Sequence, residues 1–312
     1  MNKVAITTNS ACISAFLSNE KGANMNKVAI VTDSISTVPQ QMAQEYDIKV
    51  MPLYIVMDGK DYVETEVDRS EIYARLKEKD NSLTSSSISP GICLKTWQEL
   101  SQKAESILCI AHAPSIGMSY KSAIQAKEMA RKELPKTAIE VIDSQTASGA
   151  QLLLVVTAAK VAAQGKSLPE VTEVVNNMIP RLNLISLLPS PQQLIKEGRA
   201  RAKGGDWAES RINTQSIMEM CAFTQGVMTL FARTRTRAKA MGKLIEIVKD
   251  RSKGGKLHAA ITHFCAPDEA EELKKRLLAQ FPCVELYVAE DSVVPPIHAG
   301  LGELKLGWYS ED

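Results

Sequence analysis

Short apolar runs alternate with helix-like segments between residue 25 and about residue 165, and this alternation constrains the fold more than any other feature. The runs VAIVTD, SILCIA and AIEVID begin at Val28, Ser106 and Ala138. They are mostly aliphatic, as strands buried on both faces are. Helix-like segments follow them, including PQQMAQEYD, GMSYKSAIQAKEMARKEL and ASGAQLLLVVTAAKVAAQG. This order predicts an α/β domain with a Rossmann-like, mostly parallel sheet covered by helices.

An insertion separates the first two of these strands. IKVMPLYIVMDGKDYVE predicts a strand, a turn at Asp58–Gly59 and a short return strand. A helix near RSEIYARLKEK, a polar loop LTSSSISPG and a helix near ICLKTWQELSQ are expected next.

The second half of the chain predicts another α/β unit with more antiparallel character. FTQGVMTLFARTRT reads as a hairpin that turns at Gln225–Gly226, and the helix PDEAEELKKRLLAQF lies between the strands KLHAAITHF and VELYVAE. The change of pattern falls near Gly165 to Pro169. We therefore expect two domains, residues 25–166 and residues 167–312, the second with a mixed sheet.

The beginning of the chain is written twice, as MNKVAITTNS at residues 1–10 and MNKVAIVTDS at residues 25–34. Pro39 can open a helix after the second copy, whereas the first copy runs into ACISAFLSNEKGAN, which has no helical period. Polar residues interrupt the first apolar stretch and no small-residue cleavage site follows, which argues against a secretory signal. We expect residues 1–24 to be a poorly ordered leader from a partial duplication, and the working protein to start at Met25.

Charge and cysteine usage exclude several classes of function. The net charge is +1, so nothing favours nucleic acid or an anionic membrane as a general partner. No apolar run approaches the length of a membrane span, and only transient membrane contact is left open. The six cysteines form no CxxC pair, which fits a reducing cytoplasm without disulfides or a metal site.

Partial matches to phosphate-binding motifs lack the residues or the structural context that such sites require. Gly165-Lys166-Ser167 lacks the earlier glycine of a P-loop, because Lys160 stands there, and it lies between two helices. Gly300-Leu301-Gly302 has no strand–loop–helix context for dinucleotide binding. The run RTRTR at 233–237 predicts arginines on one solvated face of a strand.

Small polar residues gather where the predicted strands end. In an open parallel sheet, ligands bind beyond the carboxyl ends of the strands, and hydroxyls there can bind an anion. For any one of these residues helix capping is the better explanation, but several at one edge of the sheet favour a site. His298 lies in a glycine-containing loop, PPIHAGLG, and Arg199 follows a predicted helix, where its guanidinium could face an anion. The strand-end candidates are Thr32, Asp33, Ser34, Ser85, Ser86, Ser115, Ser119, Asp143 and Ser144.

Six short segments, taken in order, carry a resemblance to a known family. They are VTDS after the first strand, SSSISPG at 85–91, VIDSQTASGAQ at 141–151, LIKEGRA at 194–200, RTRAKA at 235–240 and IHAGLGEL at 297–304. In this order they resemble the DegV family, which includes the fatty-acid-binding subunits of bacterial fatty acid kinase. The resemblance covers residues 25 to about 308.

The resemblance implies a two-domain α/β fold that holds a long-chain fatty acid, with no cofactor and no catalysis by this chain. The acyl chain would run into the first domain, and a partner kinase would phosphorylate the bound carboxylate. By matching position, the carboxylate would be held by Ser85, Ser86, Ser119 and His298, with Arg199 near the mouth facing the partner or a phosphate.

The headgroup loop departs from the family pattern. In APSIGMSYKSA, Gly117 stands where a headgroup-binding serine is usual and Met118 where glycine is usual. Ser115 could replace the missing donor if the loop is repositioned.

The alternative hypothesis is an enzyme that acts on a small carboxylic acid with His298 as general base. It would need a carboxylate or a second base beside His298, and Asp33 and Asp143 are the candidates. A carrier would instead need a long apolar tunnel, lined by residues such as those of SILCIA and GMSYKSAIQAKEMA.

Overall fold

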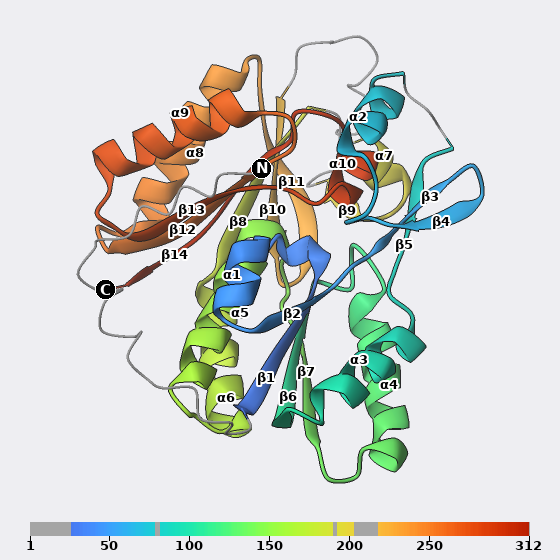
Figure 1. The fold of residues 1–312 in the computed structure, drawn as a ribbon. Coiled ribbons are helices and arrows are strands. Elements are labelled where there is room, and N and C mark those ends of the chain that lie inside the picture. The colour runs from blue at the N-terminus through green and yellow to red at the C-terminus, as the bar shows by residue number, and fades with distance from the viewer. Residues whose placement is uncertain (1–25, 79–81, 190–191, 203–217, 312) are drawn as a thin grey trace.

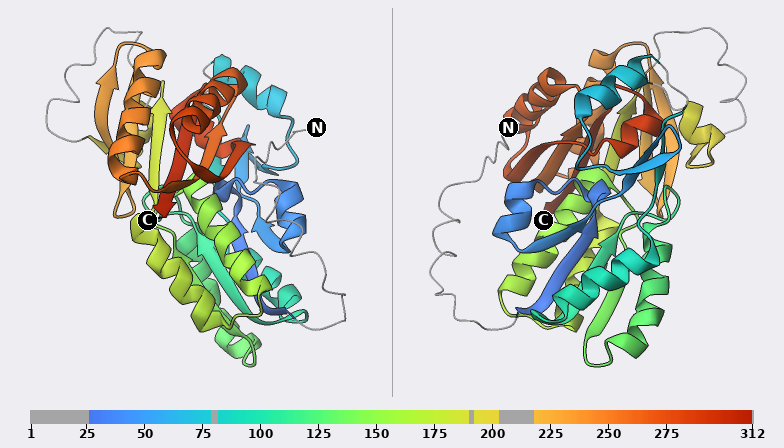
Figure 2. Two further views of the ribbon diagram at one scale, coloured as in Figure 1. Left: turned by 90° about the vertical axis from the view of Figure 1, so that its left-hand side faces the viewer. Right: turned by 45° about the vertical axis from the view of Figure 1, so that its right-hand side comes forward.

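The computed structural model describes residues 26–78, 82–189, 192–202 and 218–311 (Figure 1). The predicted leader, residues 1–24, lies outside the described residues. A parallel sheet with its helices occupies one end of the molecule, and a larger mixed sheet covered by α8 and α9 occupies the other (Figure 2). The long helix α5 contacts strands of both sheets. The α/β class predicted from strand–helix alternation is confirmed.

The four-stranded sheet has the order β2-β1-β6-β7, and each neighbouring pair is parallel. Alternate residues of each strand face opposite helical layers, because side chains alternate across a sheet. Ala29 and Val31 pack with α3 and α4, whereas Val28 and Ile30 pack with α5 and α6. The elements are β1 Asn26–Asp33, β2 Ile48–Met51, β6 Ala104–Ala111, β7 Ala138–Asp143, η1 Ser34–Ser36, α1 Gln40–Glu45, α3 Pro90–Leu100, α4 Ser119–Glu133, α5 Ser148–Ala163 and α6 Leu168–Met178.

A small antiparallel sheet, β4-β3-β5, extends from the first unit toward the second. Its hairpin turns at Asp58 and Gly59, both with positive φ (52° and 75°), as the sequence predicts. The polar segment expected to be a loop instead contains β5, whose residues Thr84, Ser85 and Ser86 pair with β3. A three-residue strand of hydroxyl side chains has no apolar alternation, so its pattern did not reveal it. The elements are β3 Tyr54–Met57, β4 Lys60–Val63, β5 Thr84–Ser86 and α2 Arg69–Lys77.

The seven-stranded sheet has the order β13-β12-β14-β8-β10-β11-β9 and mixes parallel with antiparallel pairs. The expected hairpin turns at Gln225 and Gly226, again with positive φ (49° and 75°). The apolar faces of α8 and α9 cover one side of the sheet. The elements are β8 Asn183–Leu188, β9 Ala200–Ala202, β10 Met218–Thr224, β11 Val227–Thr234, β12 Lys256–His263, β13 Cys283–Glu290, β14 Leu304–Glu311, η2 Ile179–Arg181, α7 Gln192–Lys196, α8 Arg237–Ser252, α9 Pro267–Gln280 and α10 Val294–Ala299.

The two units meet at α5, and two glycines allow this helix to approach β12 and β14 of the seven-stranded sheet closely. A Cβ on Gly149 of α5 would lie 2.6 Å from the carbonyl oxygen of Ala260 in β12. A Cβ on Gly307 of β14 would lie 2.3 Å from the amide nitrogen of Ala150. The proposed domain boundary at residues 166 and 167 falls in the turn between α5 and α6.

Two local expectations differ from the structure. His298 lies on α10 rather than in a loop, because Pro295 and Pro296 occupy the first turn of a helix, where proline is favoured. The RTRTR run spans the junction between β11 and α8, and does not form one solvated face of a strand. β11 ends at Thr234, and Thr236 caps α8 with its side chain.

No helix in the described part of the chain combines the length and apolar character needed to cross a membrane.

Candidate functional site

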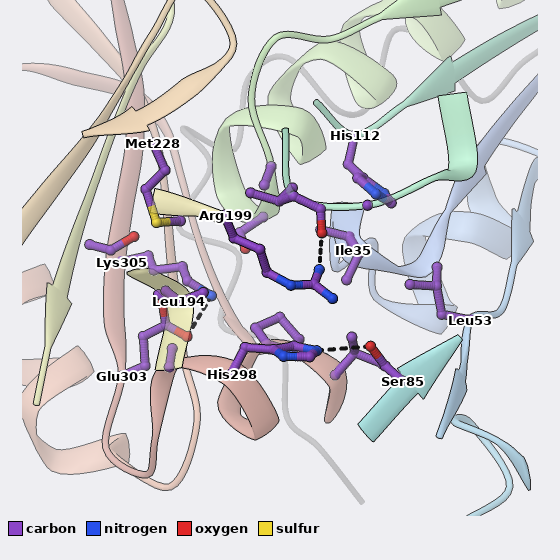
Figure 3. A pocket seen from close by; sticks show the side chains of 18 of the residues that line it. Ile35, Leu53, Ser85, His112, Leu194, Arg199, Met228, His298, Glu303 and Lys305 are labelled. Carbon is purple, nitrogen blue, oxygen red and sulfur yellow. Dashed lines mark hydrogen bonds and ion pairs between the residues drawn. The ribbon is translucent and has the colours of Figure 1, made fainter. Parts of the chain in front are cut away.

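A cavity of about 230 Å³ lies between the carboxyl-end loops of the parallel sheet and the α7, α10, β8 and β14 side of the second unit. Its wall is mostly apolar, and a few polar side chains enter it from both units (Figure 3). This combination is typical of small-molecule sites. The lining residues are Ile35, Leu53, Ser85, Ser87, His112, Ile116, Gly117, Met118, Ala147, Ser148, Leu184, Ser186, Leu194, Arg199, Phe223, Met228, Val294, Pro295, His298, Ala299, Glu303 and Lys305.

Ser85 and His298 meet in the cavity although they come from different units. Ser85 Oγ lies 2.8 Å from His298 Nε2, a hydrogen-bond distance (Figure 3). Pairing of β5 with β3 positions the serine, and α10 carries the histidine. Both are among the residues predicted to hold a carboxylate, and the structure brings these two together.

Side chains alternate across β5 and the residue that follows it, so neighbouring serines face opposite sides. Ser85 and Ser87 line the cavity, whereas Ser86 points away and donates its hydroxyl to Asp61 at 3.1 Å. Ser87 Oγ accepts the amide of Met118 at 3.1 Å. Ser86, a predicted carboxylate ligand, is therefore not on the cavity wall, whereas Ser87, which was not predicted to hold the carboxylate, lies there. A two-residue period applied to Ser85 would have selected Ser87.

Glu197 links His298 to Arg199. Its Oε2 lies 2.8 Å from His298 Nδ1, off the line of a straight hydrogen bond, and accepts the Nε–H of Arg199 at 2.7 Å. Arg199 also donates to the carbonyl oxygen of Ile116, which bridges the two units. Figure 3 shows the Arg199 guanidinium directed into the cavity. Sequence reasoning found Arg199 and His298 but missed Glu197.

The environment of His298 favours a neutral imidazole. The pKa of His298 is lowered to about 4, chiefly by burial and then by Arg199, while Glu197 opposes both effects. At neutral pH the ring carries one proton. With that proton on Nδ1, facing Glu197, Nε2 accepts the Ser85 hydroxyl hydrogen.

A buried charged cluster forms the cavity floor. Lys305 Nζ lies 2.9 Å from Glu303 Oε2 and also contacts Asp291 Oδ2. All three residues are at most 4% exposed. Burial raises the pKa of Glu303 to about 7, against the lowering effect of Lys305. Burial works against the charge of Lys305, but Asp291 and Glu303 outweigh it and raise the pKa of the ammonium.

The loop after β6 keeps its predicted serines out of the cavity. Ser115 donates its hydroxyl to the carbonyl oxygen of Gly226 at 2.5 Å, tying the loop to the β10–β11 hairpin. Ser119 begins α4 and is buried, and its Oγ has no hydrogen-bond partner among the described residues. Neither lines the cavity, so Ser115 does not occupy the place of a missing headgroup donor here.

Three of the remaining strand-end candidates bond to backbone groups of the protein. Asp33 caps η1 through the amide of Ile35, and Ser34 Oγ accepts the amide of Leu53. Thr32 donates to the carbonyl oxygen of Ile110.

The two candidates after β7 are also held in the turn that follows the strand. Asp143 accepts the amide of Gln145, and Ser144 donates to the carbonyl oxygen of Thr146. Like Thr32, Asp33 and Ser34, neither lines the cavity. Capping and turn formation, the alternative explanation of these residues, accounts for the contacts of Asp143 and Ser144 and for the bond from Ile35 to Asp33. Thr32 and Ser34 instead bond to segments distant in the chain.

Comparison with known proteins identifies the family. The DegV family model matches residues 27–311. The chain belongs to the DegV family. The DegV protein of Bacillus subtilis strain 168 is 26% identical over 287 residues, which cover 90% of this chain and 98% of that protein. A DegV domain-containing protein of Clostridium perfringens is 27% identical over 285 residues, covering 91% and 99% of the two chains. The family predicted from the ordered motifs is confirmed.

Solved DegV structures share this fold. DegV from Bacillus subtilis, described as a fatty acid binding protein, has a TM-score of 0.80 at 24% identity and covers 92% of this chain and 100% of its own. A DegV family protein from Thermus thermophilus, described by its fatty acid binding, has a TM-score of 0.80 at 23% identity, with coverage of 91% and 100%. At these identities the likeness establishes the fold.

The loop after β6 contains a close approach at Gly117. A Cβ at this position would lie 2.3 Å from His112 Nε2, so any larger residue would displace the ring. Met118 lines the cavity and is half exposed. Gly117 therefore leaves space that the imidazole of His112 occupies. His112 was not predicted, because its partners are distant in sequence.

Proposed function

We propose that this DegV-family chain binds a long-chain fatty acid, with the carboxyl group at Ser85 and His298 and the acyl chain along the apolar wall. The observation that carries the proposal is the Ser85–His298 pair, 2.8 Å apart, inside a mostly apolar cavity between the two units. A buried carboxylate needs hydrogen-bond donors, because an unpaired buried charge is costly.

The polar side chains supply such donors without a large excess of charge. The Ser85 hydroxyl can turn from His298 to the ligand, and a protonated Nε2 of His298 can donate as well. Arg199 is already balanced by Glu197, and Lys305 by Asp291 and Glu303. Because these cations are already paired, the site suits one carboxylate better than a polyphosphate.

The acyl chain supplies most of the binding free energy. Burial is worth about 0.8 kcal/mol per CH₂ group, so some fifteen methylenes contribute on the order of 12 kcal/mol before association costs. Ile35 and Leu53 line the cavity and belong to the core cluster that also contains Met51 and Met57. We propose that the chain enters this cluster as flexible methionines change rotamer.

Of the expected tunnel wall, Gly117 and Met118 at the start of GMSYKSAIQAKEMA line the described cavity, whereas the residues of SILCIA do not. Ile107 and Cys109 of β6 pack in the same core cluster and do not line it. The proposed path of the acyl chain therefore runs past Ile35 and Leu53, and reaches β6 only if side chains move.

Related structures support the ligand class. The Bacillus subtilis and Thermus thermophilus proteins are described as fatty acid binding, and a Thermotoga maritima DegV protein is described as lipid binding. The last has a TM-score of 0.79 at 23% identity.

We further propose that the bound carboxyl group is presented to a partner kinase for acyl-phosphate formation, and that Arg199 faces that partner. Arg199 is partly exposed and holds the loop at Ile116 against the second unit. A guanidinium in this place suits an anionic group on the partner's substrate.

The alternative, an enzyme that uses His298 as general base, has one feature in its favour. Glu197 provides the carboxylate beside His298 that such a mechanism needs. However, the lowered pKa of His298, about 4, makes it a weak base at neutral pH. Binding therefore explains the site better than catalysis.

Native mass spectrometry of the full chain purified from its host tests the proposal. We expect a co-purified species of fatty-acid mass, identified by lipid extraction, and a rise in melting temperature when hexadecanoic acid is added to stripped protein. Hexadecanol, which has the same chain but no carboxyl group, is the matched control ligand. The proposal would be overturned if no fatty acid co-purifies and hexadecanoic acid gives no thermal shift.

A further inference from the structure

The seven-stranded sheet presents three polar side chains to the cavity. Side chains alternate across a strand, so Leu304 and Leu306 of β14 pack under α8 and α9, whereas Glu303 and Lys305 line the cavity. Ser186 of β8 lies beside Lys305 in the strand register and lines the cavity as well. None of these three polar residues is more than 4% exposed. They form a polar floor beneath a mostly apolar wall.

Stability alone does not account for a charged pair in this place. Replacing a buried ion pair by well-packed apolar residues is often neutral or stabilising. The same face of the sheet also carries apolar residues, since Leu184, two positions before Ser186, lines the cavity too. An apolar floor is therefore compatible with this sheet, and the polar floor points to a polar group on the ligand.

The polar floor retains hydrogen-bonding capacity for such a group. An ammonium has three N–H donors, and Asp291 and Glu303 are the two acids at Lys305 Nζ, which leaves one donor over. Within the described residues, the Ser186 hydroxyl has no hydrogen-bond partner. The floor thus offers both donors and acceptors, and a hydroxyl group can use both.

The charges of the cluster favour a neutral group over a second carboxylate. Lys305 supplies one positive charge, and Asp291 and Glu303 stand against it. The cluster therefore has no net positive charge, whether Glu303 is ionised or protonated. A second carboxylate would lose its hydration here without gaining a free cation, which is costly.

The size of the cavity places the polar group close to the carboxyl end of the ligand. A volume of about 230 Å³ has room for roughly eight water-sized groups, which corresponds to a carboxyl group and the first few carbons. Figure 3 shows Glu303 and Lys305 on one side of this cavity and Ile35 and Leu53 on the other. The rest of the acyl chain would leave the cavity past Ile35 and Leu53, away from the polar floor.

We propose that the preferred ligand is a hydroxylated fatty acid whose hydroxyl group, on a carbon near the carboxyl group, binds Ser186, Glu303 and Lys305. The inference rests on the proposed fatty-acid function and narrows its substrate class. The hydroxyl donates to Glu303 and accepts a hydrogen bond from Lys305 or Ser186. An apolar floor would discriminate against such a ligand, because its hydroxyl would be buried without a partner.

Isothermal titration of the full chain with four acids tests the inference. The probes are hexadecanoic acid, 2-hydroxyhexadecanoic acid, 3-hydroxyhexadecanoic acid and 16-hydroxyhexadecanoic acid, with the 2- and 3-hydroxy acids as single enantiomers. We expect an enantiomer of the 2- or 3-hydroxy acid to bind about tenfold more tightly than hexadecanoic acid. The 16-hydroxy acid should bind more weakly than hexadecanoic acid, because its hydroxyl enters the apolar cluster.

Two variants test whether the polar floor is the source of this preference. Ser186→Ala should reduce the ratio of the two dissociation constants about threefold, and it removes a hydroxyl that bonds to no other described residue. Glu303→Leu, which leaves Lys305 paired with Asp291, should reverse the preference. A purely structural effect would weaken both acids alike and leave the ratio unchanged. Ser122→Ala, at a buried serine of α4 outside the cavity lining, is the matched control.

The outcomes separate the inference from the function on which it rests. If hexadecanoic acid binds at least as tightly as every 2- and 3-hydroxy acid, the inference is wrong and the fatty-acid function stands. A preference that persists undiminished in both Ser186→Ala and Glu303→Leu would also overturn the inference, because the hydroxyl would then bind elsewhere. If the folded chain binds none of the four acids, the proposed function and the inference both fail.

Discussion

His298 Nε2 lies 2.8 Å from Ser85 Oγ although 213 positions separate the two residues. The contact joins β5 of the small antiparallel sheet to α10, which leads into the interior strand β14 of the seven-stranded sheet. It therefore places a polar pair at the junction of the two units, where the neighbouring wall is apolar. A ligand bound there would contact both halves of the molecule.

Ser85→Ala should weaken binding of hexadecanoic acid by about tenfold, because the variant loses a hydroxyl that can bond to the buried carboxyl group. Ser86→Ala is a closely matched control. It is the adjacent residue of the same strand, but its hydroxyl bonds to Asp61 on the other face. Isothermal titration of both variants checks the prediction. Equal losses of affinity would show that β5 does not present Ser85 to the ligand.

Much of the fold follows from sequence pattern, but the site only in part. Aliphatic runs indicated β1, β6 and β7, and Asp-Gly and Gln-Gly indicated two hairpin turns that the structure contains. These features are local. The Ser85–His298 pairing came from a family resemblance, because nothing in either segment alone specifies its distant partner.

The residues missed at the site share one physical reason. Glu197 and His112 acquire their surroundings from segments far away in the chain: His112 faces Asp33, 79 positions earlier, and Glu197 faces His298. Periodicity reports which face of an element is buried and not what it meets there. Ser87 is different, since a two-residue period from Ser85 would have found it once β5 was recognised as a strand.

Lys305→Met should destabilise the fold by about 3–5 kcal/mol, because it leaves Asp291 and Glu303 as buried acids without their cation. Urea unfolding measures the change. Lys243→Met on the exposed side of α8 is the matched control and should have little effect. A loss in Lys305→Met no greater than in the control would contradict the view that this buried cluster is balanced by its lysine.

Glu303 should make the protein less stable as pH rises. Its folded-state pKa, about 7, is above the ordinary value of 4.5, so the native state binds more protons than the unfolded state between these values. The stabilisation is fully present below about pH 4.5 and is lost as pH rises through 7, amounting to up to about 3 kcal/mol.

Glu303→Gln should therefore flatten the dependence of the free energy of unfolding on pH between 5 and 8. The exposed Glu246→Gln variant should retain the slope of the unaltered chain. Denaturant unfolding at several pH values makes the comparison, and an unchanged slope in Glu303→Gln would rule out Glu303 as its source.

Binding of a fatty acid should be accompanied by proton uptake at His298. In the free protein the pKa of His298 is lowered to about 4, chiefly by burial and then by Arg199, so the ring is neutral at pH 6 to 8. A carboxylate arriving beside Nε2 favours the charged imidazole and raises this pKa, and the added proton then forms a donor to the ligand. Affinity should consequently fall as pH rises from about 4 to the pKa of the bound state, by up to about tenfold per pH unit, and level off above it. Titration calorimetry at one pH in buffers of different ionisation enthalpy counts the protons taken up.

His298→Gln, which keeps a polar side chain but cannot titrate, should show a smaller uptake and a flatter pH dependence, with His263→Gln as the control away from the cavity. Tight binding by the unaltered chain with no uptake at any pH would mean that the carboxyl group rests on the Ser85 hydroxyl and other donors, with His298 neutral throughout.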